Sequence, residues 1–69
     1  MSDKKAVEKL DRLWTITDVS EYLGVPVATL YAWRSAGRGP ASRRVGKYVR
    51  YVPAEVRAWV EALPIGVAS

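Results

Sequence analysis

The sequence predicts a small, mainly helical α+β fold with three short helices and one two-stranded β-hairpin. Three stretches carry apolar residues at helical spacing, and Gly or Pro ends each of them. Between the second and third stretches, residues 43–51 are rich in β-branched and aromatic side chains around a central glycine. With 69 residues, the chain has room for one domain with a small core.

The first predicted helix begins at Ile16 and ends before Gly24. Thr15 precedes it and Asp18 follows three residues later, which is the spacing of a capping box with Asp in place of Glu. Gly24 suits the end of the helix because glycine adopts the left-handed conformation without strain. The predicted buried stripe consists of Ile16, Val19 and Leu23.

The second predicted helix covers residues 27–36 and follows directly after Pro26. Leu30 and Trp33 are three residues apart and are expected to face the core, and Gly37 is the next stop signal. Two short helices joined by about three residues have the composition of a helix-turn-helix, whose second helix enters the major groove of DNA. A helical hairpin without a DNA-binding role would show the same periodicity.

Residues 43–51 predict a β-hairpin that turns at Gly46. A two-residue loop would place Val45 opposite Tyr48, whereas a three-residue loop would pair Val45 with Val49. We expect the longer loop, because it separates apolar from charged side chains. Its two faces would be Val45, Val49 and Tyr51 on one side and Arg44 and Arg50 on the other.

The third predicted helix begins at Pro53 and runs to about Ala62, before the stop at Pro64. Proline suits the first helical position because the missing N–H donor would have no partner there. Glu55 lies favourably in the first turn. The apolar stripe that closes the core consists of Val56, Trp59, Val60 and Leu63.

The distribution of charge is the main indication of function. Between Glu21 and Glu55 the sequence has six basic residues and no acidic one, while both ends are charge-balanced. Same-sign charges repel one another, so a partner with regularly spaced negative charge is the natural explanation, and nucleic acid fits best. The net charge of +4 and the pI near 9.8 agree, although anionic membranes or acidic proteins also attract basic surfaces. The six residues are Arg34, Arg38, Arg43, Arg44, Lys47 and Arg50.

The composition argues against several other classes of protein. Cysteine and histidine are absent, which removes disulfides, thiol nucleophiles, zinc-finger ligand sets and the commonest general base. We therefore expect neither an enzyme nor a cofactor. No apolar run approaches the roughly 18 residues of a membrane span, and Lys4 and Lys5 are not followed by an apolar signal-peptide core. A cytoplasmic location without membrane contact is the default expectation.

The order helix, tight turn, helix, basic hairpin, helix is that of a winged helix-turn-helix domain, expected over residues 13–63. Residues 1–12 are expected to form a polar tail or weak helix, and residues 64–69 a C-terminal tail. The stretches 13–26, 29–33, 45–46, 49–53 and 58–59 together resemble the MerR-like, excisionase-family DNA-binding domain. The sequence departs from that pattern at Pro26, where the family commonly has Ser or Thr, and at Ser20, where a small apolar residue is common.

This resemblance implies a function in DNA recombination. Small members of the family are often phage excisionases, also called recombination directionality factors. They bind neighbouring repeats in double-stranded DNA cooperatively, bend the DNA and direct a tyrosine integrase toward excision. Other members regulate transcription, which is the alternative for this chain. In either case the second helix would lie in the major groove and the hairpin wing against the minor groove or the backbone.

Two sets of residues are candidates for DNA contact. On the outward face of the second helix, Thr29 can reach a base edge or phosphate, while Tyr31 and Arg34 can reach phosphates. Tyr31 could instead pack against the wing. In the wing, Arg44, Lys47 and Arg50 are expected to project away from the core, and the role of Arg43 depends on the register. The sets are Ala28, Thr29, Tyr31, Ala32, Arg34 and Ser35 in the helix, and Arg38, Arg43, Arg44, Lys47 and Arg50 in the wing and its flank.

Overall fold

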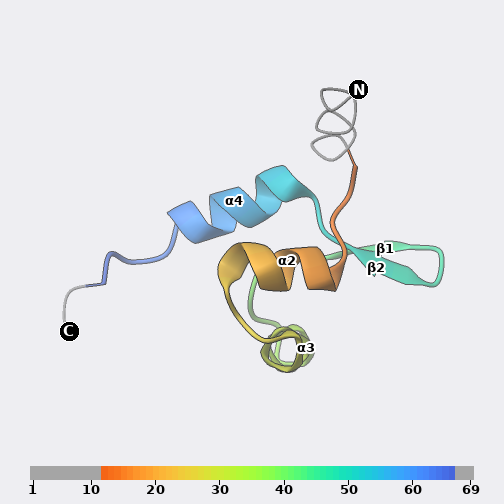
Figure 1. The fold of residues 1–69 in the computed structure, drawn as a ribbon, viewed down its shortest axis with the longest axis horizontal. Helices are drawn as coiled ribbons and strands as arrows, with labels where there is room; N and C mark the ends of the chain where they lie inside the picture. Colours follow the sequence, from red (N-terminus) through yellow and green to blue (C-terminus); the bar gives the residue numbers. More distant parts are fainter. Residues whose placement is uncertain (1–11, 67–69) are drawn as a thin grey trace.

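The computed structural model describes residues 12–66, and Figure 1 shows their arrangement. Three helices and an antiparallel hairpin confirm the predicted fold class. The expectations for residues 1–11 and 67–69 lie outside the described residues. The elements are α2 (Ile16–Leu23), α3 (Val27–Ser35), β1 (Arg43–Val45), β2 (Tyr48–Arg50) and α4 (Pro53–Glu61).

Helix α2 has the two ends that its sequence predicts. The Asp18 amide donates to Thr15 Oγ1 at 3.2 Å, and the Thr15 amide donates to Asp18 Oδ2 at 2.9 Å, so both halves of the capping box are present. Gly24 follows the helix with φ of 71°, in the left-handed region. Both boundaries of this helix are therefore confirmed.

Ser20 and Pro26, where the sequence departs from the family pattern, both form hydrogen bonds at the junction of α2 and α3. The Ser20 hydroxyl donates to the Val25 carbonyl at 2.7 Å, so a polar residue here fixes the turn between α2 and α3. Pro26 precedes α3 without a side-chain cap, and its carbonyl accepts the amides of Thr29 and Leu30. Helix α3 ends at Ser35, one residue earlier than predicted.

The predicted hairpin register is wrong, because the loop has two residues. Val45 lies opposite Tyr48, Arg44 opposite Val49, and Arg43 opposite Arg50. Gly46 has φ of 62° at the first loop position, which suits the short loop whose twist matches that of the strands. Val45 is consequently 47% exposed and lies outside the core. Arg44 and Arg50 are on opposite faces, because side chains alternate along each strand.

A short bridge adds the segment before α2 to the hairpin. Trp14 and Tyr51 exchange two backbone hydrogen bonds of 2.8 Å each, one in either direction. The bridge fixes the start of α2 beside the end of β2. The sequence gives no local signal for this pairing, because the two residues are far apart along the chain.

The core takes one fully buried side chain from each part of the fold. Val19 of α2, Leu30 of α3 and Val56 of α4 surround Tyr51, and all four are at most 2% exposed. Trp33 packs partly buried against Trp59 of α4, with ring centres 5.8 Å apart. Leu63 lies beyond the end of α4 and is exposed, so the predicted α4 stripe is wrong at this residue.

Candidate nucleic-acid interface

Helix α3 and the hairpin open onto the same hollow, which has a volume of about 280 Å³. Tyr31 of α3 lines this hollow, and residues at the start of α2 form another of its walls. In Figure 1 the hairpin projects from the helical part of the molecule beyond the start of α2. The two elements predicted to contact DNA therefore border one surface. The lining residues are Thr15, Ile16, Tyr31, Lys47, Tyr48, Val49 and Arg50.

The outward face of α3 consists of small and polar side chains. Most of its predicted site residues are exposed, and Thr29 is half-buried. Leu30 is buried and Trp33 half-buried on the inward side, as their spacing predicts. A backbone that carries such short side chains can approach another surface closely. The exposed members of this face are Ala28, Tyr31, Ala32, Arg34 and Ser35.

The core residue Tyr51 is electrostatically linked to this face. Burial raises the pKa of the Tyr51 hydroxyl above its ordinary value, Arg34 acts to lower it, and Tyr31 adds to the rise. Tyr51 therefore stays neutral at physiological pH. The exposed Arg34 is therefore close enough to Tyr51 for its charge to act on that hydroxyl.

Two wing cations gather around the exposed ring of Tyr48. Arg50 Cζ lies 5.1 Å from the ring centre and Lys47 Nζ lies 5.6 Å from it. Arg50 Nη1 also donates to the Val49 carbonyl at 2.8 Å, and the residue is half-buried. Arg50 is therefore held beside Tyr48 by its own strand, on the face of β2 opposite Val49, which packs against the core. Lys47 is exposed at the turn.

Arg43 is already paired within the molecule. Its guanidinium forms an ion pair with the carboxylate of Glu55, in the first turn of α4. The contact connects the base of the hairpin to the N-terminus of that helix. Because Arg43 also lies opposite Arg50, Glu55 relieves a repulsion between like charges.

The remaining basic residues predicted for this site are unpaired with carboxylates in the described part of the chain. Arg34, Arg38, Arg44 and Lys47 are all exposed, and the ion pairs found among residues 12–66 involve none of them. Arg38 follows α3, where its amide donates to the Trp33 carbonyl at 2.7 Å. These four charges are accessible to an anionic partner.

Sequence reasoning missed the contribution of Tyr48 and of the start of α2. Tyr48 is exposed at the centre of the wing, and Thr15 and Ile16 form a wall of the hollow. The signal for Tyr48 was an aromatic residue one position from Lys47 and two from Arg50. Thr15 and Ile16 reach the site through the Trp14–Tyr51 bridge, which no local pattern indicates.

No group of carboxylates among residues 12–66 could hold a metal ion. No helix in the same part is both long and apolar enough to cross a membrane.

Comparison with known proteins places this geometry in a family. A family model described as a helix-turn-helix domain matches residues 15–64, from the capping threonine to just beyond α4. This is a DNA-binding family that includes excisionase-like proteins. A comparison with curated proteins found no significant match.

Proposed function

Because the chain belongs to the helix-turn-helix domain family, we propose that it binds double-stranded DNA through one continuous surface of α3 and the hairpin. The observation that carries this proposal is the shared hollow, where Tyr31 of α3 meets Lys47 and Tyr48 of the wing. Helix α3 enters the major groove, and the wing lies on the adjacent minor groove or backbone.

Bases are read by the short side chains of α3. The Thr29 hydroxyl, which is half-buried, reaches a base edge or phosphate. Ala28 and Ala32 contribute close approach and apolar contact with thymine methyl groups. With Ser35 as the other polar member, discrimination between sequences is modest.

Phosphates are bound by the accessible cations and by Tyr31. Arg34 and Arg38 extend from the α3 side, and Arg44 and Lys47 from the wing. Half-buried Arg50 adds a fifth charge from beside Tyr48, on the other face of the hairpin from Arg44. Arg43 adds its charge only when it leaves Glu55, so about five charges meet the backbone. Counterion release then predicts that log affinity falls with log salt at a slope of roughly −4 to −5.

The finer proposal is that the protein is an excisionase-like architectural factor in the cytoplasm. Modest base readout and a small interface favour binding by several copies, since one copy alone would bind weakly. Such copies occupy neighbouring repeats, bend the DNA and direct a tyrosine integrase toward excision. A small transcriptional regulator is the alternative, because the family match supports DNA binding without indicating a role in recombination.

Fluorescence anisotropy with a labelled duplex tests the DNA-binding surface. Arg44→Ala is expected to reduce the magnitude of the salt slope by about 1, because the exposed side chain has no carboxylate partner within residues 12–66. Arg12→Ala, near Asp18, is the matched control and should leave the slope unchanged. A wild-type slope near −1, or equal slopes for the two variants, would contradict the proposal.

Footprinting and gel shifts on an integrase attachment region separate the two finer functions. Excisionase action predicts several adjacent protected repeats, cooperative appearance of the shifted species and a bend in circular-permutation assays. One isolated operator without bending would instead favour the transcriptional regulator.

A further inference from the structure

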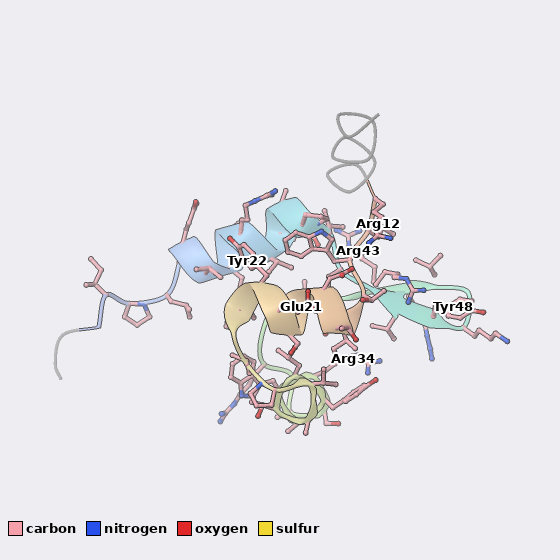
Figure 2. The ribbon with its side chains drawn as sticks, in the orientation of Figure 1. Arg12, Glu21, Tyr22, Arg34, Arg43 and Tyr48 are labelled. Carbon is pink, nitrogen blue, oxygen red and sulfur yellow. The ribbon has the colours of Figure 1, made fainter. Side chains whose placement is uncertain are left out.

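A second hollow lies on α2 and uses none of the residues assigned to DNA. It is lined by Trp14, Asp18, Glu21 and Tyr22, and it shares no lining residue with the hollow between α3 and the hairpin. Figure 2 shows Glu21 and Tyr22 on α2, well apart from Tyr48 on the hairpin. Its volume of about 240 Å³ is below the roughly 300–1,000 Å³ of pockets that enclose drug-sized molecules. A single side chain therefore fits it better than a metabolite does.

The walls of this hollow are two aromatic rings. The centres of Trp14 and Tyr22 are 5.1 Å apart and the ring planes are tilted by 51°, so the rings do not cover each other. Tyr22 is 48% exposed. Aromatic faces attract cations, and Arg57 Cζ of α4 already lies 5.9 Å from the centre of the Trp14 ring without lining the hollow.

Two carboxylates complete the hollow, and only one of them already has partners within the described residues. Asp18 accepts the Thr15 amide and lies 4.0 Å from Arg12 Nη2, so its charge is already shared. Glu21 is exposed and forms no ion pair with any of residues 12–66. A site with accessible ring surface and an accessible carboxylate is complementary to a positively charged group.

We propose that this hollow binds an arginine side chain in a basic segment of a partner protein. A planar guanidinium stacks on an aromatic face and donates two parallel hydrogen bonds to a carboxylate, whereas a lysine ammonium is a point charge. A second copy of this chain is a poorer source, because most of the accessible cations among residues 12–66 are on the surface assigned to DNA. The proposal does not depend on DNA binding.

Nuclear magnetic resonance of the full ¹⁵N-labelled chain tests the site. The probe is a short blocked Gly-Ser peptide that carries arginine, and the control peptide has neutral citrulline in its place. Titration is expected to give saturable shifts at the Trp14 indole N–H and at the amides of Glu21 and Tyr22, with the amides of α3 unmoved. Equal shifts with the citrulline peptide would overturn the proposal.

Variants locate the binding energy. Glu21→Gln and Tyr22→Leu are each expected to weaken peptide binding by about threefold, and both together by about tenfold. Glu61→Gln removes a carboxylate of α4 outside the hollow and should change nothing. Thermal unfolding checks that each variant folds. Unchanged peptide affinity in the folded double variant would contradict the assignment.

Two further arms identify the occupant. In one arm, Lys4, Lys5 and Lys9 are replaced by serine. If the peptide binds only to this variant, the hollow belongs to the chain's own N-terminal segment, and the proposal of a partner protein is contradicted. Shifts that depend on protein concentration without peptide would assign it to a second copy, with the same consequence. DNA affinity of the double variant should equal that of the wild type, so failure of DNA binding and failure of this proposal are separately visible.

Discussion

Ser20 fixes the turn between two helices with both its side chain and its backbone. Its hydroxyl donates to the Val25 carbonyl at 2.7 Å, and its own carbonyl accepts the amides of Gly24 and Val25. Three hydrogen bonds at one residue therefore fix the turn that sets α3 against α2. Since α3 carries half of the proposed DNA surface, the geometry of that surface depends on a residue that does not contact DNA.

Ser20→Ala is expected to lower the free energy of unfolding by about 1 kcal/mol, because the Val25 carbonyl loses its donor in a partly buried position. For a domain of this size that corresponds to a fall in Tm of about 4–8 °C. Thr17→Ala is the matched control on the exposed side of the same helix. It should be neutral or slightly stabilising, and an equal loss in both variants would contradict the role of Ser20.

Tyr51 makes the free energy of unfolding decrease at alkaline pH. Burial raises the pKa of its hydroxyl, so the folded state holds this proton more tightly than the unfolded state does. The resulting stabilisation is fully present below the unfolded pKa of roughly 10, and it is lost as pH rises through the folded pKa. We expect Tyr51→Phe to show a shallower decline in the free energy of unfolding above that pH. Urea unfolding across the alkaline range measures it, and parallel curves for both proteins would contradict the assignment.

At the scale of elements, contacts between neighbours in sequence were predictable. The capping box of α2, the left-handed Gly24 and the start of α4 at Pro53 are each determined within four residues, and the structure has all of them. Physical rules for helix ends act over that distance. These three features followed from the sequence for this reason.

The largest error concerns the register of the hairpin. The longer loop was expected because it sorts apolar from charged side chains, but strands of three residues leave β1 exposed throughout, so facial sorting had little weight. The conformation of Gly46 decided the register instead. The Arg43–Glu55 pair and the Trp14–Tyr51 bridge cross the fold, so no pattern along the chain indicates them.

The Arg43–Glu55 pair connects two elements and, under the proposed function, keeps one cation from DNA. Glu55→Gln is expected to raise DNA affinity, because it frees Arg43 and removes a negative charge beside the wing. The stability cost should be below about 1 kcal/mol, since both side chains are partly solvent-exposed. Anisotropy and thermal unfolding measure the two effects on the same samples.

Glu61→Gln is the control for Glu55→Gln, because it makes the same change in net charge at the other end of α4, away from Arg43. A larger gain in affinity for Glu55→Gln would assign the excess to the released guanidinium. Equal gains would mean that Arg43 stays where it is, as a structural residue of the hairpin base.

At the scale of the whole molecule, the charges that we propose bind DNA oppose folding. Arg43 and Arg50 are directly opposite each other, and Arg34, Arg38, Arg44 and Lys47 add further positive charge without carboxylate partners in the described part of the chain. Within residues 12–66, the core against which this repulsion acts has only four large buried side chains. Repulsion among these cations therefore destabilises the free protein, and bound DNA would neutralise it.

This repulsion predicts that added salt has opposite effects on the Tm of the free protein and on its affinity for DNA. Raising NaCl from about 0.01 M to about 0.1 M shortens the Debye length from roughly 30 Å to roughly 10 Å, which screens the repulsion among the wing and α3 cations. The Tm of the free protein should rise, while its affinity for duplex DNA falls. Arg44→Ala should show a smaller rise in Tm over the same range, because it starts with less repulsion. If the Tm of the free protein instead fell with added salt, attractive pairs such as Arg43–Glu55 would outweigh the like charges, and the basic surface would be part of what stabilises the fold.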